Sequence, residues 1–139
     1  MTHIFDVAFS FAGENRGFVE DVKNDLRKGG YNVFYDNDYK SELWGSDLTI
    51  ELPKKYYESQ FVVLFLDDNY LNKMWTFFER QIIIEKYLRD RGADYILPVL
   101  LNDFNKPIPG ISGLIGHLKI NVPQDKDLLV DMIIRKLKH

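Results

Sequence analysis

The chain has 139 residues, with 18 basic and 21 acidic side chains and a formal net charge of −3, a length that fits one compact domain. Its hydrophobic content of 45% excludes disorder, and its slight acidity argues against binding to the phosphate backbone of nucleic acid. The absence of cysteine excludes disulfides, thiolate metal sites and a cysteine nucleophile.

The sequence also argues against a membrane protein. The longest apolar runs, such as Phe61–Leu66, are far shorter than the ~20 residues that a membrane-spanning helix needs. A strand-like run already begins at Ile4, so we expect no signal peptide. Since a chain without cysteine suits a reducing compartment, we expect a cytoplasmic protein with neither a membrane nor a nucleic-acid partner.

Apolar runs and helical patterns alternate along the whole chain. The first half predicts, in order, a strand at Ile4–Phe11, a helix from Phe18 that ends at Gly29-Gly30, a strand at Asn32–Tyr35, an irregular polar stretch at Asp36–Gly45 and a helix from Asp47 to about Tyr57. The second half predicts a strand at Phe61–Leu66, a helix from Asp67 to about Arg89, a strand at Tyr95–Leu101, a short strand at Leu118–Asn121 and a helix at Asp125–Leu137. Ser46 is the expected N-cap of its helix, and Pro98 indicates a bulge or an edge position.

Five strands that alternate with helices predict an α/β fold with a parallel sheet covered on both faces. For a single domain over residues 1–139, the flavodoxin-like strand order 2-1-3-4-5 is the leading choice. Ligands of such sheets bind at the carboxyl ends of the strands, where the strand order reverses. That rule directs attention to Ser10–Arg16, to the loop after the second strand and to Asp67–Glu79.

The sequence lacks the motifs of several common kinds of binding site. The sequence has neither GxGxxG nor GxxxxGK[ST], the two glycine motifs that bind phosphate. His3, His117 and His139 have no partner at metal-ligand spacing, so no metal site is expected. Asp67 and Asp68 resemble an acidic phosphoacceptor pocket, but the acidic residues after the first strand and the lysine after the fifth, which a receiver domain needs, are absent.

Glu79 is the informative residue of the helix predicted after the third strand. At about 100° per residue, Glu79 lies roughly 40° from Trp75 and among isoleucines, on an apolar face. A carboxylate in such a place costs free energy unless it is paired or opens into a cleft. Two interpretations therefore stay open: Glu79 pairs with a neighbouring cation at the surface, or it lines a functional cleft.

Six segments, in the correct order, resemble a TIR (Toll/interleukin-1 receptor) domain of the bacterial type. They extend from residue 5 to about residue 115 and so cover most of the chain. They are FDVAFSF followed by AGENR at 5–16, LWGSDL at 43–48, FVVLFL at 61–66, WTFFER with its WxxxE pattern at 75–80, YILPV at 95–99 and IPG at 108–110.

The resemblance implies an enzyme that cleaves NAD at the nicotinamide–ribose bond, with Glu79 as the catalytic residue. Bond cleavage builds oxocarbenium character on the ribose, which a carboxylate can stabilise. NAD is then the substrate, and no cofactor is expected. The predicted substrate-binding residues are Ser10, Phe11, Ala12, Arg16, Asp36, Trp44 and Trp75.

The role of several of these residues stays open. Trp75 either walls the pocket or belongs to the core, and Arg16 either meets a phosphate or lies on the surface. Trp44 stacks on a base, packs onto another copy of the protein or folds back onto its own helix. Asp36 either contacts the ligand or caps a turn.

The resulting prediction is a TIR domain that converts NAD to nicotinamide and an ADP-ribose-type product, linear or cyclised, in bacterial antiphage defence signalling. Expected partners are a second copy, through the Asp36–Gly45 loop, and a downstream effector that senses the nucleotide product. The alternatives are a non-enzymatic TIR module that acts by homotypic assembly and a flavodoxin-like domain for another small nucleotide.

Overall fold

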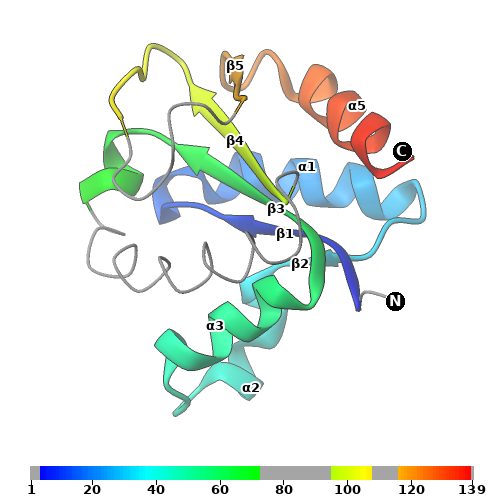
Figure 1. Ribbon diagram of the computed structural model, residues 1–139, viewed down its shortest axis with the longest axis vertical. Helices are drawn as coiled ribbons and strands as arrows, with labels where there is room; N and C mark the ends of the chain where they lie inside the picture. The colour runs from blue at the N-terminus through cyan, green and yellow to red at the C-terminus, as the bar shows by residue number, and fades with distance from the viewer. Residues whose placement is uncertain (1–3, 73–94, 108–115, 139) are drawn as a thin grey trace.

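A five-stranded parallel sheet in the order β2-β1-β3-β4-β5 forms the centre of the protein (Figure 1). The computed structural model describes residues 4–72, 95–107 and 116–138. The strands are β1 (Phe5–Ser10), β2 (Val33–Phe34), β3 (Ser59–Leu66), β4 (Ile96–Leu101) and β5 (Leu118–Ile120). All four neighbouring pairs are parallel, which confirms the predicted fold class and strand order.

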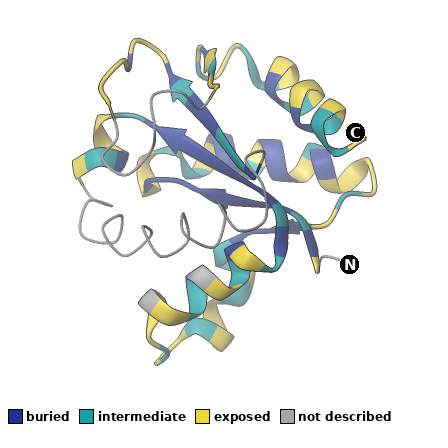
Figure 2. Cartoon of the chain, in the orientation of Figure 1, coloured by how far each residue is buried: buried dark blue, intermediate teal, exposed yellow. Residues whose placement is uncertain are grey.

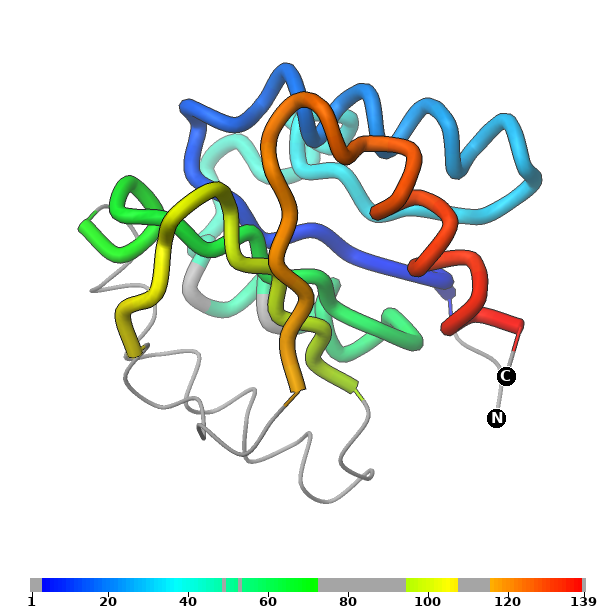
Figure 3. Tube along the Cα trace, turned by 90° about the horizontal axis from the view of Figure 1, so that it is seen from above, coloured from blue at the N-terminus to red at the C-terminus, as the bar shows by residue number. Residues whose placement is uncertain are grey.

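The described helices lie on both faces of the sheet (Figures 1 and 3). They are the 3₁₀ turns η1 (Gly13–Asn15) and η2 (Asp36–Tyr39) and the α-helices α1 (Arg16–Lys28), α2 (Lys40–Leu43), α3 (Leu48–Tyr57) and α5 (Lys126–Leu137). Of the helix predicted from Asp67 to Arg89, the structure describes only the helical start at 68–72. None of the helices among these described residues is long and apolar enough to cross a membrane.

Two apolar layers hold the sheet between the helices. Val7 and Phe9 of β1 point to the face that α1 and α5 cover. Ala8 of β1 and its neighbour Val62 of β3 point to the opposite face, where Tyr56 of α3 packs. Because alternate residues of a strand face opposite sides, burial on both faces explains why the strands read as continuous apolar runs. Figure 2 shows this most clearly for β1 and β3, which are dark blue over most of their length.

The stretch Asp36–Gly45, predicted to be irregular, instead forms the short helices η2 and α2. Tyr39 anchors the first of them, because its ring packs at 5.1 Å from the ring of Phe34 and at 6.1 Å from that of Phe5. Lys55 of α3 covers the same ring, with its Nζ 5.2 Å from the ring centroid. These contacts are tertiary, so the local sequence pattern carries no sign of them.

The surroundings of Ser46 and Pro98 test the roles that the sequence predicts for these two residues. The Ser46 hydroxyl donates to the Leu43 carbonyl at 2.7 Å, and the Asp47 carbonyl accepts the first bonds of α3, so the prediction of Ser46 as N-cap is wrong. Pro98 pairs with Leu64 in an uninterrupted register, and the first β4–β5 pair is Val99 with Leu118. Pro98 thus occupies a half of β4 that pairs only with β3 among the described strands, which agrees with the edge position.

Candidate active site

The last residue of β1 and the two residues after it are buried. Ser10, the last residue of β1, is 1% exposed, and its Oγ lies 3.0 Å from the phenolic oxygen of Tyr70. Phe11 and Ala12 are buried as well. These three predicted residues therefore offer a ligand almost no accessible surface among the described residues.

Arg16 is bound by the end of β2 rather than free at the surface. Its two terminal nitrogens lie 3.1 and 3.3 Å from the two carboxylate oxygens of Asp36, and the first of them also donates to the Tyr35 hydroxyl at 3.0 Å. The guanidinium carbon lies 5.0 Å from the centre of the Phe11 ring. The hydrogen bond to Asp36 is the largest influence on Arg16 and raises its pKa. Arg16 and Asp36, both predicted site residues, therefore form one bidentate pair.

Tyr35 supports this pair from behind. Its hydroxyl accepts from Arg16 and donates to Glu20 Oε2 at 2.9 Å, and the Nζ of Lys23 lies 4.5 Å from the centre of its ring. Burial raises the pKa of the Tyr35 hydroxyl, so the hydroxyl stays protonated and able to donate. The contacts tie α1 to the end of β2 and fix the position of Arg16.

A groove of about 710 Å³ opens beside the pair. It is lined by Arg16, Asp36, Asn37, Lys40, Ser41, Leu43, Trp44 and Leu48. The structure therefore brings together three of the predicted residues, Arg16, Asp36 and Trp44. Trp44 is 89% exposed, so it does not fold back onto its own helix.

Three polar groove residues, Asn37, Lys40 and Ser41, were missed by sequence reasoning. They lie in the polar stretch after β2, one of the segments at the carboxyl ends of the strands where a ligand is expected. The stretch has no apolar periodicity, however, and only its short helices decide which side chains face the groove. Lys40 makes no ion pair with any residue that the structure describes, so its charge is available to a ligand.

The remaining two predicted residues, Trp75 and Glu79, lie outside the described residues, as does the IPG segment at 108–110. The structure does describe the segment that leads to them. Asp67 follows β3 directly, and its Oδ1 accepts the Tyr70 N–H at 2.8 Å. Asp67 thus caps the helical start at 68–72, which begins at the same edge of the sheet as the loop after β1.

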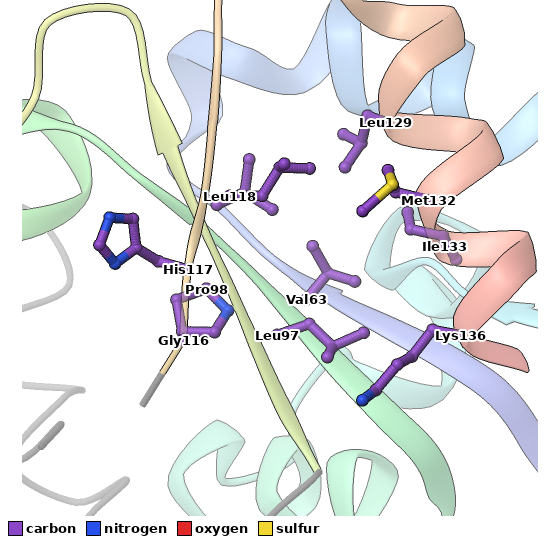
Figure 4. A pocket seen from close by; sticks show the side chains of 11 residues that line it. Val63, Leu97, Pro98, Gly116, His117, Leu118, Leu129, Met132, Ile133 and Lys136 are labelled. Atoms are coloured by element: carbon purple, nitrogen blue, oxygen red, sulfur yellow. The ribbon is translucent and has the colours of Figure 1, made fainter. Parts of the chain in front are cut away.

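A second hollow, of about 330 Å³, lies away from this edge, between α5 and the first halves of β4 and β5 (Figure 4). Leu97, Leu118 and Ile133 contribute apolar side chains to it. Its lining holds few polar groups, with Lys136 of α5 and His117 as the titratable ones. A hollow of this composition lacks the hydrogen-bonding groups that a nucleotide requires, so the groove beside Arg16 is the better candidate for such a ligand.

The groove offers complementary chemistry in a small space. Trp44 presents an exposed aromatic face, Lys40 a positive charge, and Arg16 with Asp36 a neutral pair that retains hydrogen-bonding capacity. Stacking, charge and hydrogen bonding are together the interactions that a nucleotide needs. The fold and the groove thus define an α/β domain of the doubly wound type with a polar site at the carboxyl ends of β1 and β2.

The comparison with known proteins narrows this class to one family. The chain belongs to the TIR domain family, whose sequence profile matches residues 7–129. It is 38% identical over 135 residues to the 3′ cyclic ADP-D-ribose synthase AaTIR of Aquimarina amphilecti. That match covers 96% of this chain but 40% of the relative, so the chain spans less than half of the relative's length.

Solved structures agree on the fold. The TIR domain of the Toll-related receptor TRR-2 from Hydra magnipapillata superimposes with a TM-score of 0.66 at 14% identity, with 97% of this chain and 99% of that chain covered. A metazoan TIR-STING receptor from C. gigas, in complex with 2′,3′-cGAMP, gives a TM-score of 0.67 at 15% identity and covers 94% of this chain and 40% of that one. At these identities the likeness concerns the fold alone.

Proposed function

We propose that this TIR domain cleaves NAD at the nicotinamide–ribose bond and forms a cyclic ADP-ribose. The observation that carries the proposal is the 38% identity, over 96% of this chain, to a 3′ cyclic ADP-ribose synthase. Such a product needs an ADP-ribosyl group with a good leaving group on the ribose. NAD fits, because its pyridinium becomes neutral nicotinamide when it leaves.

The reaction balances without a cofactor. The bond between the ribose C1 and the pyridinium nitrogen breaks, and its electron pair goes to the nitrogen. The ribose acquires oxocarbenium character, as in glycoside hydrolysis. A hydroxyl of the same molecule then forms the new bond to C1 and loses its proton, which gives a cyclic product; water in the same place gives linear ADP-ribose.

Glu79 is the carboxylate that we assign to this charge, as its place in WxxxE suggests. A fixed negative charge beside the developing cation stabilises the transition state more than the ground state. Trp75, one helical turn earlier in the predicted helix, would wall the nicotinamide end. Both assignments rest on the sequence.

The groove residues divide the rest of the substrate between them. The positive charge of Arg16 is matched by Asp36, so this pair is suited to the hydroxyls of a ribose rather than to a phosphate. Lys40 is the groove cation without an ion-pair partner in the described part of the chain, and it suits the pyrophosphate. Trp44 offers a surface on which the adenine can stack.

The test is to incubate the concentrated protein with NAD and to resolve the products by chromatography. We expect nicotinamide together with cyclic ADP-ribose as the main products. Glu79→Gln keeps the shape of the side chain but removes its charge, so nicotinamide release should fall by orders of magnitude while the circular dichroism spectrum is unchanged. An E79Q variant with wild-type turnover would contradict the mechanism.

We also propose that the domain associates with itself through the Asp36–Gly45 loop. Trp44 is almost fully exposed, and Leu48 and Ile50 of α3 are exposed apolar side chains a short distance along the chain. Exposed apolar groups of this kind favour a protein contact. The same feature supports the second candidate, a non-enzymatic assembly module. Release of nicotinamide in the NAD assay would exclude this module, and the absence of release would favour it.

A cytoplasmic location, an effector that senses the product and a role in defence against phage belong to the same proposal. A cyclic nucleotide is a signal only if another protein binds it. Purified cyclic product added to a cell extract should then bind to a protein of the extract. An excess of linear ADP-ribose should not displace the cyclic product from that protein.

A further inference from the structure

Two hydrogen bonds join the end of β1 and the turn after it to the segment after β3, although 52 and 60 residues separate the partners in the sequence. In the first, the Asn15 amide nitrogen donates to Asp67 Oδ2 at 2.8 Å. In the second, Ser10 Oγ and the Tyr70 hydroxyl lie 3.0 Å apart. We call these two bonds together the β1–β3 tie.

Asp67 performs two tasks with its two carboxylate oxygens. Oδ1 accepts the backbone N–H of Tyr70 at 2.8 Å and so caps the helical start at 68–72, while the Asp67 carbonyl accepts from the N–H of Leu71 at 3.1 Å. Oδ2 accepts from Asn15. The same side chain therefore starts this helix and binds it to the turn η1.

The second bond of the tie lies in the interior. Ser10 and Tyr70 are each 1% exposed, and burial raises the pKa of Tyr70 to about 12. A hydrogen bond between two buried hydroxyls offsets part of the cost of removing them from water. The bond holds the end of β1 at a fixed place against the helical start.

We propose that Asn15 and Asp67 are positioning residues, which hold the helix that carries Glu79 in place against the loop after β1. The inference rests on the proposed NAD cleavage. The sequence predicts that the helix capped by Asp67 continues to about Arg89. A bond at its start then sets where Glu79 stands relative to a substrate bound beside η1.

This role predicts a specific kinetic effect. Misplacement of a reacting group by about 1 Å can cost on the order of 10²-fold in rate, whereas none of the four residues of the tie lines the groove around Arg16, Lys40 and Trp44. Loss of the Asn15–Asp67 bond should therefore lower kcat and leave KM for NAD nearly unchanged. A general loss of stability would instead reduce the amount of active protein at the assay temperature.

The test exchanges the donor and the acceptor. Asn15→Asp sets two carboxylates against each other and breaks the bond. In the N15D/D67N double variant an amide at position 67 can cap the helix with its oxygen, since Asn is a good N-cap, and donate with its nitrogen to position 15. The double variant also has the net charge of the wild type. N15A, which removes the donor without adding charge, is the second variant in case N15D folds poorly.

We expect kcat of N15D and N15A to fall at least about tenfold with KM within threefold of the wild type, and kcat of N15D/D67N to recover to within about threefold. The matched control is Asn32→Asp directly before β2, at the amino ends of the strands. The Asn32 side chain donates to the Ile4 carbonyl at 2.7 Å, so N32D should lower Tm but not kcat.

The outcomes separate this inference from the function on which it rests. A wild-type protein that releases no nicotinamide overturns the proposed function, and the positioning role with it. An active wild type with N15D and N15A equally fast overturns the positioning role alone. A double variant as slow as N15D does the same, because the restored bond would then have no effect on the rate.

Discussion

Arg16 uses most of its hydrogen-bonding capacity within the protein. Of the five N–H groups of a guanidinium, three donate to Tyr35 and Asp36. The side chains of Arg16 and Asp36 remain 38% and 40% exposed, so solvent screens the ion pair and its contribution to stability is modest. Its value lies in geometry: two donors of Arg16 are held in a fixed place at the rim of the groove.

The buried Tyr70 makes the free energy of unfolding depend on pH in the alkaline range. Burial raises its pKa to about 12 in the folded state, against about 10 in the unfolded chain. The unfolded state therefore loses its proton first, and the stabilisation, complete below pH 10, is lost as the pH rises towards 12. Urea unfolding should show this fall, with about 1 kcal/mol from Tyr70 by pH 11.

Tyr70→Phe removes the titrating group, so the fall in the free energy of unfolding between pH 9 and 11 should be smaller in Y70F than in the wild type. Tyr57→Phe, which removes the hydroxyl of an exposed tyrosine, is the matched control for the substitution itself. Equal slopes for Y70F and the wild type would show that Tyr70 titrates as it does in the unfolded chain.

For single residues, the sequence predicted which positions lie near the candidate site but not which residues they contact. Arg16, Asp36 and Trp44 were predicted because they lie in segments that follow predicted strands, and the ends of such strands meet at one edge of a parallel sheet. The contacts of Tyr35 with Glu20 and Lys23 depend on how α1 packs against β2. No local pattern encodes that packing.

The strands and helices show the same difference between what the sequence predicts and what it does not. The strands were predicted well because burial on both faces leaves long apolar runs, and β3 differs from its prediction only by an earlier start at Ser59. The helices η2 and α2 were missed because a single aromatic anchor, Tyr39, replaces the periodic apolar face of a longer helix. These short helices in turn form one wall of the groove.

The helix α2 and the residue that follows it should control self-association. Trp44 is the most exposed of the large apolar side chains among the described residues, and its burial in a second copy would remove a large apolar area from water. Nicotinamide release per molecule should therefore rise with protein concentration, and Trp44→Ala should flatten that rise.

The matched control for W44A is Leu128→Ala on α5, which also removes an exposed apolar side chain but lies on the opposite face of the sheet (Figure 1). L128A should keep the wild-type dependence on concentration. Specific activity that is independent of concentration in the wild type would contradict association through this loop.

The architecture of the whole molecule separates the groove beside Arg16 from the hollow under α5. The strand order places the reversal between β1 and β3, so the groove beside Arg16 and the β1–β3 tie lie at the carboxyl ends of the strands. The hollow under α5 is lined by the first residues of β4 and β5. The sequence could predict this edge from topology alone, whereas the hollow under α5 arises from the spacing of packed elements.

The location of the bound nucleotide is therefore a test of the whole arrangement. NAD added at millimolar concentration to the E79Q variant should shift backbone amide signals in Ser10–Arg16 and Asp36–Gly45. The signals of Asn102 and Asn121, at the carboxyl ends of β4 and β5, should stay nearly unchanged, as should those of the residues that line the hollow under α5. Binding in an isolated monomer is weakened by the fraction of molecules with a complete site, so the position of the shifts is the decisive reading. Shifts confined to α5, or none with concentrated protein at saturating NAD, would favour the assembly module over the enzyme.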